Sequence, residues 1–541
     1  MTEKTPNPTP WGTNLTDIET IMAQMSLEEK IGQVMVIGIK GAKLDSQARE
    51  MLEQYHIGGV ILFARNLHSP QQIAELTNDL QRAALNSGHP GLLVSIDQEG
   101  GRVARLTEEL GFTEFPGAMA LAATGDVESA RRVAQALAAE LKAAGVNANY
   151  APVLDVNNNP ANPIIGIRSF GSDPNRVSEF GVAYLEGLQS QGVLAFGKHF
   201  PGHGDTGVDS HVALPLVPHG RDRLEAVEFV PFQAAMEQNV AGIMSAHITF
   251  PAVDPTPGLP ATLSAQVLTG LLRDEMGYDG LLITDALEMG ALSESGYPAP
   301  LAAALALQAG ADLLLFTHGD DQPFAAHNLI LEWVQSGKIP QSRLDQAVRR
   351  VLQAKSDFDL LSPTPVDVEA VSGRVNTQEH RALSRAAAVQ SITLVRDDAN
   401  LFPIEPGTTL LVVEPPLARG LGHALNATFI EVNENPTAAE IRSALAAARD
   451  GYTTIVAIND LPRHPQQAAL AQALLQAGHP TIVVAIRSPY DLAALPQAPT
   501  CLTSYGFNPP ALDALTAVLT GRAQPQGELP VELPNLGSVG E

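Results

Sequence analysis

Short apolar segments alternate with longer amphipathic segments from about residue 15 to about residue 356 of this chain. Continuous apolar runs of this kind are typical of parallel strands that are buried on both faces. Eight runs fit the pattern: Gln33–Gly38, Gly59–Phe63, Gly91–Asp97, Asn147–Asp155, Val193–His199, Val240–His247, Gly280–Asp285 and Ala311–Phe316. Eight strand–helix units in about 340 residues predict an α/β fold of the (β/α)8 TIM-barrel type. The pattern alone leaves a doubly wound open sheet as the alternative.

Helix start signals lie between the predicted strands. Ser26-Leu-Glu-Glu29 fits a capping box, which opens a helix before the first strand. Three further helical patterns follow a residue that commonly precedes a helix: Val127–Ala144 after Asp126, Asn175–Gln189 after Asp173-Pro174, and one segment that runs from Gly220 to Gln238. These signals support the strand–helix alternation.

Ionisable residues end five of the eight predicted strands. They are Asp97, Asp155, Lys198-His199, His247 and Asp285. The carboxyl ends of the strands meet at one face of a parallel barrel, and barrel enzymes carry their active sites there. Unrelated strand ends have no reason to collect charge in this way. The polar ends therefore favour the barrel over the open sheet and predict an active site at its mouth.

A second α/β pattern follows the barrel and predicts a smaller α/β sandwich domain. We expect the barrel over residues 1–360, a linker over 361–378 and the second domain over 379–541. A helix near His380–Val389 precedes a crossover sheet of about five strands: Ser391–Val395, Thr409–Val413, Thr453–Ile458, Thr481–Ile486 and Thr500–Tyr505. Gly420-Leu-Gly422 resembles half of a dinucleotide loop, but Leu425 occupies the third glycine position, so we interpret it as an ordinary turn.

The composition excludes several classes of partner. With 33 Lys and Arg against 59 Asp and Glu, the net charge is −26, which argues against nucleic acid and anionic membranes. Cys501 is the one cysteine, so internal disulfides and multi-thiolate metal sites are excluded, and we expect a buried or inert thiol. Residues 1–17 are polar and Pro-rich, and Pro300–Phe316 is too interrupted to span a bilayer. We therefore expect a soluble cytoplasmic protein.

The segment from Lys198 to His211, Lys-His-Phe-Pro-Gly-His-Gly-Asp-Thr-Gly-Val-Asp-Ser-His, concentrates ionisable residues after the fifth strand. Two interpretations stay open. Its imidazoles and carboxylates, His199, His203, Asp205, Asp209 and His211, are all possible metal ligands. Alternatively, Asp209 and His211 are two residues apart and can place a carboxylate beside an imidazole. That pair suits metal-free general acid–base catalysis.

Three other segments supply polar groups to the predicted mouth. Asp285 follows the apolar run Gly280–Thr284, where a carboxylate can serve as a nucleophile or as a metal ligand. Asp97 is followed by Gln-Glu-Gly-Gly, whose glycines allow a sharp turn that lets Arg102 or Arg105 face the mouth. Arg168 follows the fourth strand. Carboxylates and guanidinium groups around a pocket suit the hydroxyl groups of a sugar.

These four segments, in this order and on these strands, resemble glycoside hydrolase family 3. The Lys198–His211 loop is similar to that of the NagZ-type β-N-acetylglucosaminidases (β-N-acetylhexosaminidases) within the family, and the resemblance begins at Met25-Ser-Leu-Glu-Glu-Lys-Ile-Gly-Gln33. It implies that Asp285 is the catalytic nucleophile and that His211, paired with Asp209, is the general acid/base. It also implies a metal-free, cofactor-free retaining mechanism and a second domain that supplies no catalytic group. The residues that it assigns to the non-reducing sugar are Asp97, Arg105, Arg168, Lys198 and His199.

We therefore expect an exo-acting β-N-acetylglucosaminidase that acts on β-linked GlcNAc in muropeptides or chitin fragments, in peptidoglycan or amino-sugar recycling. The glycines of the loop, Gly202, Gly204 and Gly207, predict that it moves and brings His211 in when substrate binds. The alternatives are a β-N-acetylglucosaminide phosphorylase on the same site, a metal-dependent barrel hydrolase and a non-catalytic sugar-binding protein. The aglycone and the oligomeric state are not readable from the sequence.

Overall fold

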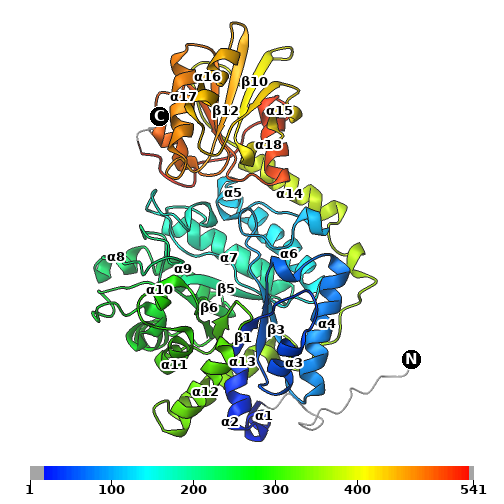
Figure 1. The fold of residues 1–541 in the computed structure, drawn as a ribbon, viewed down its shortest axis with the longest axis vertical. Helices are drawn as coiled ribbons and strands as arrows, with labels where there is room; N and C mark the ends of the chain where they lie inside the picture. Colours follow the sequence, from blue (N-terminus) through cyan, green and yellow to red (C-terminus); the bar gives the residue numbers. More distant parts are fainter. Residues whose placement is uncertain (1–17, 535–541) are drawn as a thin grey trace.

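The computed structural model describes residues 18–534 and contains two separate β-sheets, each with its own helices (Figure 1). The first sheet is parallel, with strand order β7-β6-β5-β4-β3-β2-β1-β8. Its strands are β1 Met35–Gly38, β2 Gly59–Leu62, β3 Leu93–Ile96, β4 Ala148–Asn149, β5 Leu194–Phe200, β6 Gly242–Ser245, β7 Leu281–Ile283 and β8 Leu314–Phe316. A parallel bridge from Ile283 to Leu313 joins the two ends of the sheet. The sheet is the predicted, nearly closed barrel, and the open-sheet alternative is wrong.

Helices surround this barrel on the outside, and side chains from the strands fill its interior (Figure 1). The helices are α1 Ile18–Gln24, α2 Leu27–Gln33, α3 Ser46–Glu53, α4 Pro70–Asn86, α5 Ala118–Ala123, α6 Val127–Ala143, α7 Pro174–Ser190, α8 Arg221–Ala226, α9 Val230–Glu237, α10 Gly290–Ser293, α11 Ala299–Ala309, α12 Gln322–Gln335 and α13 Gln341–Asp357, with a π-helix over Gln266–Glu275. The capping box at Ser26 and Glu29 is present, and Asp126 and Asp173 cap α6 and α7 as predicted.

The single helix expected from Gly220 to Gln238 is wrong, because two helices occupy this segment. The first, α8, ends at Ala226, and α9 begins at Val230. Pro231 lies in the first turn of α9, where its missing N–H costs nothing. In a continuous helix its ring would meet the carbonyl of Val227, so the chain breaks before it.

The second sheet contains six strands in the order β11-β10-β12-β13-β14-β9. They are β9 Thr393–Asp397, β10 Thr409–Glu414, β11 Thr428–Glu431, β12 Tyr452–Ile458, β13 Thr481–Ala485 and β14 Thr500–Thr503, flanked by α14 Gln378–Ser391, α15 Leu421–Ala424, α16 Ala438–Ala447, α17 Pro465–Gln476 and α18 Pro509–Leu519. Five of the strands match the prediction. β11 was not predicted because it is an edge strand whose residues are exposed or half-buried and give no apolar run. β9 pairs antiparallel with β14.

The second domain packs against the barrel (Figure 1), and hydrogen bonds and an apolar cluster join the two. The Tyr490 hydroxyl donates to the backbone carbonyl of Asn157 (3.0 Å). The backbone N–H of Glu528 donates to Ala123 (2.8 Å), and that of Ser172 donates to Pro530 (3.2 Å). Side chains of both domains, including Met119 and Tyr505, share one apolar cluster. The exact domain boundaries stay a prediction.

Two further expectations concern single segments. Among the helices of residues 18–534, none combines the length and the apolar character needed to cross a membrane. The polar segment of residues 1–17 lies outside the described residues. Cys501 is buried on β14, as predicted, and burial raises the pKa of its thiol to about 11.

A buried carboxylate holds the seam where the barrel closes. Asp312, just before β8, is fully buried and accepts the backbone N–H of Leu282 on β7 (3.1 Å). It also accepts charge-assisted hydrogen bonds from Arg273 (2.6 Å) and Arg343 (2.8 Å). Arg350 Nη1 lies farther from it, at 3.4 Å. The seam therefore depends on one charge that three guanidinium groups surround.

Replacing Asp312 with alanine is expected to lower the free energy of unfolding of the barrel by about 3–5 kcal/mol, because two nearly buried guanidinium groups lose their counter-charge. Urea unfolding followed by tryptophan fluorescence measures the change. Asp279→Ala is the matched control, since Asp279 is exposed and its partner Arg350 keeps a second carboxylate, Asp312, at 3.4 Å. It should cost about 1 kcal/mol or less. Equal losses in the two variants would contradict the role given to Asp312.

Candidate active site

The carboxyl ends of the barrel strands surround a cavity of about 500 Å³. Its polar lining comes from segments far apart in the sequence, and apolar walls from Ile61, Phe63, Met244 and Leu315 lie between them. The predicted site residues that line it are Asp97, Arg105, Arg168, Lys198, His199, His211 and Asp285. Asp209 lies behind His211 and does not line the cavity. The strand-end argument from the sequence therefore predicted where these side chains meet.

An ion network occupies one side of this cavity. Lys198 Nζ lies 2.9 Å from Asp97 Oδ1 and 2.7 Å from Glu99 Oε1. Arg168 donates to both oxygens of Glu99, with Nε at 2.9 Å and Nη2 at 2.7 Å. Lys198 and Glu99 are almost fully buried. Two carboxylates and two cations thus neutralise one another, and the network fixes the orientation of each side chain.

Glu99 is the central member of this network and was not predicted as a site residue. Burial alone would raise the pKa of its carboxyl, but the charges and hydrogen bonds of Arg168 and Lys198 hold that pKa far below its ordinary value. Its position two residues after Asp97, in the same Asp-Gln-Glu-Gly-Gly-Arg segment, was the one signal in the sequence. That signal became meaningful only when the fold brought Arg168 alongside.

Two arginines from the segment after β3 complete this wall. Arg105 lies over the ring of Phe63, with its guanidinium carbon 5.7 Å from the ring centroid, and its Nη2 is 3.9 Å from Asp97. Arg102 also lines the cavity. Gly100 and Gly101 have positive φ values of 86° and 56°, which turn the backbone so that both arginines point inward. The sequence analysis expected Arg102 or Arg105 to face the mouth, and in the structure both line the cavity.

Asp155 anchors two histidines at the start of the loop. Its carboxylate accepts the backbone N–H groups of His199 (3.1 Å) and His203 (2.6 Å), and it lies 2.7 Å from His199 Nδ1. Nε2 is the ring nitrogen of His199 that remains for a ligand. His203 is held by Thr206 and Ser210. Burial, followed by the neighbouring His199, lowers the pKa of His203 to about 4, so His203 is neutral at pH 7 and braces the loop.

Asp285 lies at the carboxyl end of β7 and lines the cavity. Burial alone would raise the pKa of its carboxyl, but the imidazoles of His199 and His247 and the N–H of Ala286 (2.7 Å) together lower it. His247 bonds the Ala286 carbonyl (2.9 Å), and burial lowers its pKa. Asp285 is therefore ionised at neutral pH and fixed in orientation, which suits a nucleophile.

Asp209 and His211 form a pair on the Gly-rich loop. Asp209 Oδ1 lies 2.9 Å from His211 Nδ1 and accepts the backbone N–H of His211 (2.9 Å). Burial would raise the pKa of Asp209, but the N–H and the ring of His211 lower it. The His211 side chain is 59 % exposed, and its carbonyl accepts the N–H of Gly290 on α10 (3.3 Å). The predicted movement of this loop stays a prediction.

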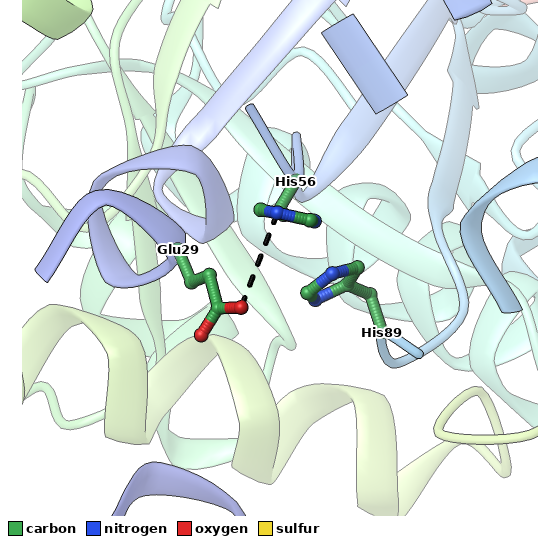
Figure 2. Close-up of side chains that lie close together, drawn as sticks. All are labelled: Glu29, His56 and His89. Atoms are coloured by element: carbon green, nitrogen blue, oxygen red, sulfur yellow. Dashed lines mark ion pairs between the residues drawn. The ribbon is translucent and has the colours of Figure 1, made fainter. Parts of the chain in front are cut away.

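The possible metal ligands of this loop do not converge on one point. They form separate pairs: His199 with Asp155, His203 with Thr206 and Ser210, Asp205 with His219, and Asp209 with His211. Within residues 18–534, the one group of at least three His, Cys, Asp or Glu residues whose ligand atoms lie within 4.8 Å of one another is Glu29, His56 and His89 (Figure 2). It precedes β2 and β3 at the amino ends of the strands, on the side of the barrel away from the cavity.

Comparisons with known proteins agree with this arrangement. The family model described as "Glycosyl hydrolase family 3 N terminal domain" matches residues 26–354. "Beta-hexosaminidase A" of Pseudoalteromonas piscicida is 33 % identical, covering 90 % of this chain and 91 % of that protein. A family 3 β-N-acetylglucosaminidase structure from Paenibacillus sp. str. FPU-7 has 40 % identity and a TM-score of 0.88, covering 94 % of this chain and 99 % of that chain. The structure of β-glucoside phosphorylase BglX has 27 % identity and a TM-score of 0.83, covering 98 % of this chain and 99 % of that chain.

The ion network generates a prediction about pH. Glu99→Gln removes one charge and leaves Arg168 and Lys198 facing each other, so the free energy of unfolding should fall by about 3–5 kcal/mol at pH 7. The folded-state pKa of Glu99 lies below its ordinary value, so the ionised carboxylate stabilises wild type fully above about pH 4.3 and progressively less below it. Urea unfolding at about pH 7 and about pH 3.5 should therefore give a smaller difference at the lower pH.

Glu75→Gln, at an exposed position of α4, is the control. Its free energy of unfolding should stay close to that of wild type at either pH. A stability difference between wild type and Glu99→Gln that stays constant over this pH range would contradict the ionised state of Glu99.

Proposed function

The chain belongs to glycoside hydrolase family 3, and from that premise we propose that it is a retaining, exo-acting β-N-acetylglucosaminidase that works through a covalent Asp285 intermediate. That it is a glycosidase of the β-hexosaminidase type follows from the family match and the relatives. The observation that carries the proposal is that Asp285 and His211 line one cavity, each oriented by a hydrogen-bonding partner.

The non-reducing sugar binds against the ion network in this proposal. Lys198, Arg168 and Asp97 present charged donors and acceptors to the cavity, and these can bond the vicinal hydroxyl groups of a pyranose. Arg105 adds donors beside them, and His199 Nε2 remains to bond a hydroxyl group. Because the network is already neutral and ordered before the sugar arrives, little side-chain entropy is lost on binding. A closed set of polar groups around one ring supports exo action on a terminal residue.

The first chemical step is attack by the ionised Asp285 carboxylate on the anomeric carbon. The bond from that carbon to the leaving oxygen breaks, and the oxygen takes a proton from Nε2 of the His211 imidazolium. In the second step His211 Nε2 removes a proton from water, whose oxygen bonds the anomeric carbon as the bond to Asp285 breaks. Two displacements at one carbon retain its configuration.

Asp209 sets the state of His211 in this cycle. A carboxylate at Nδ1 fixes the tautomer with its proton on Nδ1 and leaves Nε2 to exchange the catalytic proton. It also stabilises the imidazolium that step one requires. An Asp–His pair thereby replaces one of the two carboxylates of the usual double-displacement scheme. Within the described residues, the lining of this cavity comes entirely from the barrel, which supports an acid/base that the second domain does not supply.

Phosphorolysis is the second candidate on the same site. The 27 % identical phosphorylase structure covers nearly this whole chain, and a neutral imidazole base does not repel phosphate as a carboxylate would. Phosphate would then replace water in the second step and yield a sugar 1-phosphate. The natural source of the sugar, muropeptides or chitin fragments, and the cytoplasmic location stay predictions.

The test is release of 4-nitrophenol from the aryl β-glycosides of GlcNAc and of glucose, with chelator present. Wild type should prefer the GlcNAc substrate. Asp285→Ala should lose ~10³-fold or more of kcat, since it removes the nucleophile. His211→Ala should lose about 10²- to 10⁴-fold of kcat for a poor alkyl leaving group, and less for nitrophenol, which needs less protonation.

His219→Ala is the matched control for His211, since it removes an imidazole that also faces a carboxylate, Asp205, but does not line the cavity. It should keep near wild-type kcat. Full activity in the Asp209→Ala, His211→Ala double variant would transfer the acid/base role to another residue. A requirement for phosphate would favour the phosphorylase, and inhibition by chelator would favour a metal-dependent reaction.

A further inference from the structure

A second cavity, of about 530 Å³, lies between the barrel and the second domain and adjoins the proposed sugar site. Arg102 and Ile164 line both cavities. The barrel contributes the segment from Pro160 to Ile167, and the second domain contributes residues that follow β12 and β13. These are the carboxyl ends of two adjacent parallel strands, the edge at which open α/β sheets bind ligands.

Three guanidinium groups line this second cavity: Arg102 from the barrel, and Arg463 and Arg487 from the second domain. Arg102 is half-buried, and no carboxylate within residues 18–534 lies within 4.0 Å of it. Burial lowers its pKa to about 10, and the positive charges of Arg487, Arg168 and Arg463 contribute to that shift. In a chain with a net charge of −26, this local excess of positive charge is a specific feature of the cavity.

The second domain holds its two arginines in place. The Asp491 carboxylate is almost buried and accepts the backbone N–H groups of Asp460 (2.8 Å) and Leu461 (2.9 Å), which fixes the loop that carries Arg463. Arg487 donates to Asp460 (2.8 Å) and is mostly buried, whereas the Arg463 side chain is 51 % exposed at the cavity edge. The same Asp460 oxygen lies 3.9 Å from Arg463, so its single charge is shared between two of the three cations. Burial raises the pKa of Asp491 to about 6.

The cavity also lies beside the proposed acid/base. The charge of Arg463 contributes to the lowered pKa of Asp209, the partner of His211. His211 protonates the leaving oxygen in the proposed mechanism, and the cavity that His211 lines shares Arg102 and Ile164 with this second cavity. A leaving group longer than one sugar can therefore extend from the first cavity into the second. Pro163, Ile165 and Pro462 give part of its wall an apolar surface against which the body of that group can pack.

We propose that Arg102, Arg463 and Arg487 form a leaving-group site, built from both domains, that binds a carboxylate on the aglycone. The inference rests on the proposed function and deepens it, because it names the chemical class of substrate. Guanidinium groups bind carboxylates through two parallel N–H···O bonds, which neutral hydroxyl groups do not match. The site therefore favours an acidic aglycone over a neutral one of equal size. Inorganic phosphate shares this oxyanion chemistry and is separated from the carboxylate by the experiment.

The experiment compares two disaccharides in which β-linked GlcNAc is attached to a sugar that carries either a carboxylic acid or the corresponding methyl amide. Released GlcNAc gives kcat/KM for each, and the acid/amide ratio is the readout. Wild type should show a ratio above one. Arg463→Gln should lower that ratio by about 10- to 100-fold, the worth of a hydrogen bond to a charged group. Arg463→Lys should restore part of it because it keeps the charge.

Arg442→Gln, at an exposed position of α16, is the matched control and should keep the wild-type ratio. Arg463 lies at the cavity edge, so its variants should fold, and circular dichroism checks this. Equal kcat/KM values for the acid and the amide in wild type, or a ratio unchanged in Arg463→Gln, would overturn the carboxylate site while leaving the glycosidase intact. Cleavage of neither disaccharide would overturn the proposed function itself, and the site would fall with it.

The phosphate arm repeats these measurements with and without inorganic phosphate. If the inference is right, phosphate competes with the aglycone carboxylate for the arginines. The acid/amide ratio of wild type then falls, and the product stays free GlcNAc. If instead Arg463→Gln reduced only the formation of GlcNAc 1-phosphate and left the ratio unchanged, the arginines would serve phosphate as the acceptor, and the carboxylate inference would be wrong.

Discussion

The ion network of Asp97, Lys198, Glu99 and Arg168 is the interaction on which the mouth of the barrel depends. Buried charges are costly unless each is paired and hydrogen-bonded. Here they alternate in sign: the two carboxylates follow β3, Lys198 lies on β5, and Arg168 lies between β4 and α7. The network can form only if the strands are parallel and in this register. The closure of the sheet and the geometry of the site therefore depend on each other. Asp312, just before β8, supports the closure by accepting the N–H of Leu282 on β7.

Most of the barrel and much of the site could be predicted from the sequence because both depend on local patterns. A strand that is buried on both faces has a continuous apolar sequence. A polar residue at its carboxyl end is therefore predicted to lie at the mouth of the barrel. Asp97, Lys198 and Asp285 could be identified in that way. β4 shows the limit of the method: the apolar run extends to Asp155, but the strand ends at Asn149. Pro152 has no N–H for the ladder, and the chain rejoins the sheet only through a bridge at Val153.

What could not be predicted depends on partners that are distant in the sequence. Glu99 resembles any loop carboxylate until Arg168 lies beside it, and β11 carries no apolar run because one edge of it has no neighbour. Arg463 and Arg487 are ordinary loop arginines of a domain without a recognisable motif. Their meaning arises from where the second sheet packs on the barrel. Domain placement is a tertiary property that local periodicity does not encode.

This division also bears on how a two-domain glycosidase can acquire specificity. The proposed sugar site lies wholly within the barrel, where the ion network and Asp285 line one cavity, so we expect a substitution there to affect binding and chemistry together. The cavity between the domains touches that site only through Arg102 and Ile164. Residues on its far wall can therefore change the preferred leaving group while the catalytic charges keep their arrangement. A second domain that supplies no catalytic group can thus still determine which substrate the barrel cleaves.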